Sequence, residues 1–315
     1  HYAFVFTEAN PKYDNVIQSQ LLAKVVIQNY EESPNKFKGT GLTSGYDPIR
    51  IGTFSNDSSR LLVVDSMGTA LSEDPLRPTV LDGDYELPTQ AGVVERLKKI
   101  QNTTFSVHGF KQGISQHIQG NEWKLIHKYS GEPNDYETLK KLELGFSDLD
   151  GFNLNDMYAV GGRGDVMHFD GNTWKKIAFP SNQYLTNVCC AGDGWVYISG
   201  QGGAIFKGKK NSWKQIIESH STLDHRDLVW YRDRLYCTND YGFWQIKDDQ
   251  LSQVDVPAEI TICCGHLSVA DDVMLLGGIY GVAAYEDEQW YVIADLAEFR
   301  ALVEKEKRSE EHSNE

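Results

Sequence analysis

Residues 157–174 read MYAVGGRGDVMHFDGNTW, and this stretch contains the pattern that decides the fold. An apolar strand leads into a glycine-rich turn, a second strand follows, and a polar turn then precedes a tryptophan. Residues 195–213, WVYISGQGGAIFKGKKNSW, repeat this order. Looser copies lie at 105–123, 234–251 and 273–290, so the chain contains an internal repeat.

The spacing within and between the copies gives the repeat length. From turn glycine to tryptophan there are ten residues in three copies and nine in two others, one of which has leucine instead. The pairs are Gly113 and Trp123, Gly164 and Trp174, Gly203 and Trp213, Gly242 and Leu251, and Gly281 and Trp290. The last four closing positions are separated by 39, 38 and 39 residues, so one unit is about 39 residues long.

A repeat of this length, made of short strands, predicts an all-β fold of the β-propeller class. Each unit would supply a four-stranded antiparallel sheet that buries its faces by stacking on its neighbours. The recurrent tryptophan suits the outer strand, where its ring covers the seam between sheets. The innermost strands are expected to precede the copies, at 93–100, 185–191, 227–231 and 260–264. Two of these segments carry adjacent cysteines, which we interpret as small residues packed at the hub.

The number of blades follows less directly from the repeat. A sixth, degenerate unit is expected at 49–84, and the segments 2–6 and 21–28 resemble strands of a further blade. We therefore favour seven blades, with six as the alternative. The predicted propeller domain covers residues 1–293, and residues 294–315 are expected to form a short C-terminal helix and a polar tail.

Composition restricts the classes of partner. The formal charge of −15 argues against non-specific nucleic-acid or anionic-membrane binding and is compatible with a basic protein partner. Five cysteines without a CxxC spacing favour free thiols in a reducing cytosol, and no apolar run is long enough to span a bilayer. No signal-peptide pattern opens the chain, although the start at His1 leaves open a removed leader. We expect a cytoplasmic protein that is monomeric on its own.

No set of residues in the sequence forms a convincing catalytic constellation. The HExxH motif, the phosphate-binding P-loop and the nucleophile elbow are all missing. The oxygen-rich segment 148–156 lacks the register of a calcium loop and is better explained as a turn. Arg163-Gly164-Asp165 spells an adhesion motif but occupies the turn position of its blade. We therefore predict no catalytic residues, no metal and no cofactor.

The candidate binding residues come from propeller geometry. Turns between second and third strands open on the same face as the connections between blades, and these segments vary most among the copies. Tyrosine and arginine on a rigid frame are typical of protein-binding hot spots, whereas a solvated face without a partner is the alternative. The predicted partner-binding residues are Lys111, Gln112, Arg163, Asp165, Tyr184, Gln201, His225, Asp240, Tyr241 and Tyr280.

The opening residues 2–11 and the copy at 152–174 also carry a resemblance to a known family. The chain resembles bacterial WD40-like propeller proteins that are encoded beside secreted polymorphic toxins of the contact-dependent or type VI kind. The resemblance covers residues 2–293, although the WD dipeptide itself is missing. It implies a cytosolic partner of a toxin, acting as its immunity protein, and it implies no catalytic residues.

Three functions therefore remain open at the level of sequence. The first is a non-enzymatic immunity protein that binds and neutralises a co-encoded toxin, whose basic surface the excess acid would attract. The second is an adaptor or chaperone that holds an effector for loading without neutralising it. The third is a propeller enzyme or sugar-binding protein with its site in the central channel.

Overall fold

The computed structural model describes a chain of short strands that falls into two compact units. The described residues are 2–8, 22–28, 37–42, 49–66, 68–73, 85–86, 92–109, 112–120, 122–131, 138, 141, 145–297 and 301. Unit 1 comprises His1–Val188 and Lys210–Trp213, and unit 2 comprises Cys189–Lys209 and Lys214–Glu315. Each unit is described by itself below.

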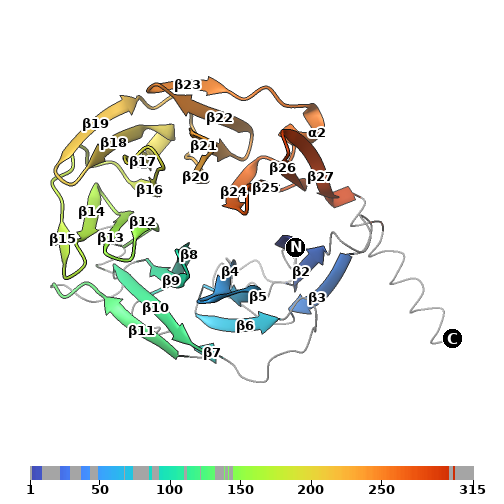
Figure 1. The fold of residues 1–315 in the computed structure, drawn as a ribbon, viewed down its shortest axis with the longest axis horizontal. Coiled ribbons are helices and arrows are strands. Elements are labelled where there is room, and N and C mark those ends of the chain that lie inside the picture. The colour runs from blue at the N-terminus through green and yellow to red at the C-terminus, as the bar shows by residue number, and fades with distance from the viewer. Residues whose placement is uncertain are drawn as a thin grey trace. The chain divides into compact units, whose positions relative to one another are not determined.

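Unit 1 contains sheets whose strands follow one another in chain order (Figure 1). The first sheet has three strands, β1 (Tyr2–Glu8), β2 (Leu22–Gln28) and β3 (Phe37–Leu42). The next has four, β4 (Arg50–Phe54), β5 (Asp57–Val64), β6 (Thr69–Glu73) and β7 (Tyr85–Glu86). A third consists of β8 (Val94–Ile100), β9 (Thr103–His108), β10 (Gly113–Gln119) and β11 (Glu122–His127). A fourth consists of β12 (Asp148–Asn153), β13 (Asp156–Gly161), β14 (Asp165–Phe169) and β15 (Trp174–Lys176).

Three more four-stranded meanders complete the described strands. The first contains β16 (Leu185–Cys190), which spans the division between the units, with β17 (Val196–Gly200), β18 (Ile205–Lys209) and β19 (Ser212–Ile217). The second contains β20 (Asp227–Tyr231), β21 (Arg234–Asn239), β22 (Gly242–Lys247) and β23 (Gln250–Gln253). The last contains β24 (Gly265–Ala270), β25 (Val273–Gly278), β26 (Gly281–Glu286) and β27 (Gln289–Asp295).

These sheets confirm an all-β propeller and correct the blade count. Among the described residues six sheets have four antiparallel strands, so the alternative of six blades is confirmed and the favoured count of seven is wrong. The reason lies before residue 49, where β1, β2 and β3 pair with one another and no fourth described strand joins them. Apolar segments at the start of the chain indicated strands, and the described residues before 49 form three, one fewer than a four-stranded blade has.

One expected inner strand is also wrong. Residues 260–264 do not form a strand, because the segment begins with the single-turn helix α2 (Ala258–Thr261), and the innermost strand β24 starts only at Gly265. Pro257 directly precedes the helix, and its carbonyl accepts hydrogen bonds from the amides of Ile260 and Thr261. The two cysteine pairs are therefore not equivalent, since only Cys189 and Cys190 lie in an inner strand.

The recurrent tryptophans occupy the place predicted for them. Trp123, Trp174, Trp213 and Trp290 all lie in the fourth strand of their sheets. The ring of Trp290 meets the ring of Phe243 on the preceding sheet edge to face, with centroids 5.7 Å apart. These rings cover the seam between sheets and withdraw a large apolar area from water.

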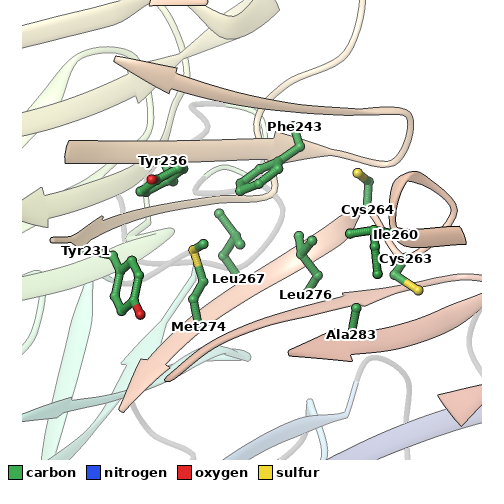
Figure 2. Packing of buried hydrophobic residues seen from close by; sticks show 10 residues of the cluster. All are labelled: Tyr231, Tyr236, Phe243, Ile260, Cys263, Cys264, Leu267, Met274, Leu276 and Ala283. Atoms are coloured by element: carbon green, nitrogen blue, oxygen red, sulfur yellow. The ribbon is translucent and has the colours of Figure 1, made fainter. Parts of the chain in front are cut away.

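Unit 2 has a core cluster at such a seam (Figure 2). Tyr236 and Phe243 from β21 and β22 stack with centroids 5.4 Å apart, and they pack against Leu276 of β25. Ile260 on α2 and Cys263 just after it close one side of the cluster. The short helix therefore supplies apolar cover for this cluster from the connection that precedes β24.

Two glycines permit the connections between sheets to pass close to the second strands. A Cβ on Gly278 would overlap the carbonyl oxygen of Cys264 and lie 2.8 Å from the carbonyl carbon of Cys263. Gly161 is placed in the same way, since a Cβ there would overlap the carbonyl oxygen of Gly145. Backbone atoms cannot withdraw as a flexible side chain can, so both positions require glycine.

Two predictions concern segments near or beyond the described residues. The expected C-terminal helix falls mostly outside them, although Leu296, Ala297 and Ala301 are helical. Within the part of the chain that the structure describes, no helix combines the length and apolar character needed to cross a membrane.

Candidate protein-binding surface

The two ends of the sheets in unit 2 are built differently. At one end, four hairpins are closed by two residues that both have positive φ, which defines the tight turns that match strand twist. These residues are Arg232 and Asp233, Asp248 and Asp249, Asp271 and Asp272, and Asp287 and Glu288. We call this the hairpin end, and its turns are as short as hairpin turns can be.

The opposite end carries the longer connections, and we call it the loop end. It consists of residues 201–203, 218–226, 240–241, 254–264 and 279–280. The carboxylate of Asp227, at the start of β20, accepts hydrogen bonds from the ring of His266 at 2.8 Å and from the amide of Leu267 at 3.1 Å. These contacts join the sheet of β20–β23 to the sheet of β24–β27 at this end.

Hydrogen bonds hold the loops of this end in place. The amide of Gly202 donates to the Asp224 carboxylate at 2.7 Å, and the hydroxyl of Ser219 donates to the carbonyl of Gln201 at 3.0 Å. Arg226 forms a two-pronged ion pair with Asp240, with distances of 2.9 and 2.8 Å. The guanidinium of Arg226 lowers the pKa of the Asp240 carboxyl, and the carboxylate in turn raises the pKa of Arg226.

The ion pair between Arg226 and Asp240 should contribute little to the free energy of unfolding, and this can be tested. The side chain of Arg226 is 52 % exposed, so solvent screens the pair and we expect Asp240→Asn to lower the free energy of unfolding by less than about 1 kcal/mol. The same change should speed amide exchange in 240–241, because one anchor of that turn is lost. Urea unfolding and hydrogen exchange measure the two effects. A loss of several kcal/mol would contradict this description.

Exposed apolar side chains gather on the loop end. Tyr241 is 74 % exposed, Tyr280 58 % and Ile279 57 %. Ile262 and Leu223 are also exposed on the neighbouring connections. Single exposed apolar residues are ordinary, but five on the connections at one end of three adjoining sheets form a surface of the kind that contacts another protein.

The same connections are rich in carboxylates. The acidic residues of the loop end are Glu218, Asp224, Asp240, Asp255 and Glu259. Over the same described ranges Arg226 is the single Lys or Arg, and Asp240 already neutralises it. An open pocket of about 480 Å³ lies among these loops and is lined by Gln201, Gly202, Ser219, Thr222, Leu223 and Asp224.

One predicted contact residue of unit 2 lies beneath this surface. His225 is 3 % exposed and packs against His220 and Trp244, with ring centroids 5.5 and 6.0 Å away. Burial first, and the neighbouring His220 second, lower the pKa of His225 to about 4. The histidine is therefore neutral at pH 7 and supports the loop from inside.

The predicted residues of unit 1 form two linked groups. The side-chain amide of Gln112 donates to the carboxylate of Asp165 at 3.0 Å, and Lys176 forms an ion pair with the same carboxylate. Arg163 and Tyr184 are paired through their backbones, and the hydroxyl of Ser147 donates to the Tyr184 hydroxyl at 3.2 Å. Gln112 and Asp165 are buried, so the hydrogen bond between them mainly fixes the turn that presents Arg163.

The ten predicted residues thus divide by environment. Tyr241 and Tyr280 are well exposed, as are Arg163 and Gln201. Tyr184 and Asp240 are partly exposed, and Gln112, Asp165 and His225 are buried. Lys111 lies outside the described residues. Sequence analysis missed Ile262 because its segment was assigned to a strand, and Leu223 because it lies between charged and polar loop residues.

The oxygen-rich segment and the adhesion-like triplet are both parts of ordinary strands and turns. The oxygen-rich segment at 148–156 forms the hairpin of β12 and β13, in which the Asn153 side chain accepts a hydrogen bond from the amide of Asn155 at 2.8 Å. Asp165 of the adhesion-like triplet is buried. Among the residues that the structure describes, no three His, Cys, Asp or Glu side chains gather as they would around a metal ion.

Sequence comparison finds no matching protein-family model. A curated relative is the immune protein Tsi7 of Pseudomonas aeruginosa, which is 29% identical over 182 residues. This chain has a relative among immune proteins. The match covers 58% of this chain and 58% of the relative, so it spans little more than half of each. It confirms the resemblance to propeller proteins of the immunity type, which residues 2–11 and 152–174 carry.

Solved structures that share this fold have little sequence identity to the chain. A catalytically inactive virginiamycin B lyase from Staphylococcus aureus, crystallised with quinupristin, matches with a TM-score of 0.60 at 9% identity over 92% of this chain and 88% of that one. The extracellular domain of a protein assigned as a hybrid two component system from B. thetaiotaomicron gives 0.59 at 13% identity, over 89% of this chain and 37% of that one. At such identities the likeness concerns the fold alone.

Proposed function

We propose that this chain is a non-enzymatic immunity protein that binds and neutralises a toxin encoded beside it. The observation that carries the proposal is the likeness to an immune protein, at 29% identity over 58% of the chain. A protein-binding role also agrees with the exposed tyrosines, which stand on loops held by hydrogen bonds and ion pairs. The toxin, its secretion system and a cytoplasmic location are parts of this proposal.

A rigid propeller can neutralise a toxin by occlusion. Loops that are already ordered lose little conformational entropy when they bind, so more of the contact energy remains as affinity. Acidic groups around the contact would raise the association rate with a basic toxin domain. No covalent chemistry by the immunity protein is required, because a tightly bound partner blocks the toxin's site.

Co-expression tests the proposal directly. We expect cells that produce the neighbouring toxin domain to survive when this chain is co-produced, and the purified pair to elute from gel filtration as one complex. A toxin domain inactivated at its catalytic residue serves as the control, because it should form the same complex without affecting growth. The proposal is overturned if the complex does not form. A stable complex in which the toxin remains active would favour the adaptor function instead.

A further inference from the structure

We infer that the loop end of unit 2 is the surface that contacts the partner, and that its occupant is a protein surface presenting arginine or lysine side chains around an apolar centre. This inference rests on the proposed function and names the site and the partner chemistry. The loop end was defined above by residues 201–203, 218–226, 240–241, 254–264 and 279–280.

The apolar centre is provided by equivalent turns of two neighbouring sheets. Tyr241 lies between β21 and β22, and Tyr280 lies between β25 and β26. Contacts between β20 and β24 and between β21 and β24 place these sheets next to each other. Two exposed tyrosines on fixed turns offer large contact areas with few rotatable bonds, as hot-spot residues do.

The rim of the loop end selects for cations. The loop end contains five acidic residues and one arginine, and Asp240 pairs with that arginine. Glu218, Asp255 and Glu259 are exposed on the connections of the same end. A guanidinium or ammonium group of a partner can pair with these carboxylates and lie over the tyrosine rings, where the π-electrons also attract it.

The hairpin end is also acidic, but its acids have a different origin. Its aspartates occupy turn positions with positive φ, which Asp tolerates better than most residues. Asp249 there forms ion pairs with Lys207 and Lys214, so part of that charge is already neutralised. Trp195, just before β17 at the hairpin end, has an exposed ring. The ammonium of Lys207 lies 5.8 Å from the centroid of that ring, within cation–π distance. At the loop end, exposed apolar side chains therefore coincide with five acidic residues, which outnumber the single arginine, Arg226.

The test compares matched variants in binding to the purified toxin domain encoded beside the chain. We expect the double change Tyr241→Ala and Tyr280→Ala to raise the Kd by about 100-fold or more, since each ring acts as a hot spot. Tyr291→Ala, on the outer strand β27, and Trp195→Ala, at the hairpin end, remove exposed rings as controls and should change the Kd by less than about 3-fold. Thermal unfolding of each variant checks that it remains folded.

A second pair of variants tests the charge of the partner. Glu218→Lys at the loop end should lower the association rate by about 10-fold at low salt and much less in 0.5 M salt, because screening removes long-range attraction. Glu122→Lys, an exposed glutamate of β11 in unit 1, makes the same change of charge elsewhere and should leave the rate nearly unchanged. An equal effect of both variants would overturn the cationic occupant.

The outcomes separate this inference from the proposed function. Loss of binding in the tyrosine variant, with protection of amides in 240–241 and 279–280 in the wild-type complex, supports the loop end. If the tyrosine variant binds as tightly as the wild type, or if Trp195→Ala abolishes binding, the loop end is not the contact surface. Either result leaves the proposed function intact. Failure of the wild-type chain to bind the toxin overturns both.

Discussion

Alanine at Gly278 is expected to lower the free energy of unfolding by about 3 kcal/mol, the upper part of the range for overpacked sites. The new methyl group would overlap the carbonyl oxygen of Cys264 and approach the carbonyl carbon of Cys263. Both obstacles are backbone atoms of the connection that enters β24, and this connection is fixed by α2 and by the cluster in Figure 2. The strand or the connection must shift, and either shift disturbs the seam between two sheets.

The neighbouring Gly277 supplies the control. A Cβ on Gly277 would meet no atom within 4 Å, and its φ is not in the left-handed region, so Gly277→Ala should be neutral or slightly stabilising. Gly161→Ala repeats the test in unit 1, where the overlap is with Gly145. Urea unfolding monitored by tryptophan fluorescence gives the three free energies. Equal stability of the Gly277 and Gly278 variants would contradict the close approach.

The turn glycines of the repeat show how far the sequence could predict the fold. The spacing from turn glycine to tryptophan gave the repeat, because every sheet must bury the same faces and therefore needs the same residues at the same positions. It gave the outer strand correctly at Trp174 and Trp290. It could not give the count of blades, because the first sheet lacks the glycine-to-tryptophan spacing. Only the segments 2–6 and 21–28 resembled strands, and β3, which contains two glycines, was not predicted.

The candidate surface was only partly predictable. Turn positions such as Tyr241 and Tyr280 follow from the repeat itself, and both are exposed. Burial of Asp165 and His225 could not be read from the sequence, because it depends on side chains brought in from other strands. Ile262 was missed for a related reason, since apolar residues in a short segment fit a buried strand and a single helical turn equally well.

Acid is expected to destabilise the protein between pH 6.5 and pH 4, and two buried histidines dominate this effect. Burial lowers the pKa of His108 and that of His225 to about 4 each, from an ordinary value of 6.5. In this range the unfolded chain binds protons that the folded chain does not, so stability is complete above pH 6.5 and falls as the pH drops. Each histidine should cost about 2 kcal/mol at pH 5 and about 3 kcal/mol at pH 4.

Their neighbours explain why the two rings remain neutral when the protein is folded. The ring of His108 contacts the carbonyl of Gly92 at 3.1 Å and the hydroxyl of Ser115 at 3.2 Å. That carbonyl favours the charged form, but loss of hydration outweighs it. At His225 the nearby His220 adds to the effect of burial, since a second positive charge would be repelled.

Single substitutions can separate the two contributions, because the slope of unfolding free energy against pH counts protons and does not depend on absolute stability. His225→Gln should remove about half of the loss between pH 6.5 and pH 5, and His108→Gln should remove a similar part. The double variant should lose most of the slope over this interval, where most carboxyl groups of the unfolded chain are still ionised. His127 contributes to the slope that remains, because burial lowers its pKa as well. Urea titrations at half-unit pH steps measure these slopes. If the double variant retained the wild-type slope, other groups would be responsible for the acid sensitivity. In that case burial would not be lowering the pKa values of the two histidines.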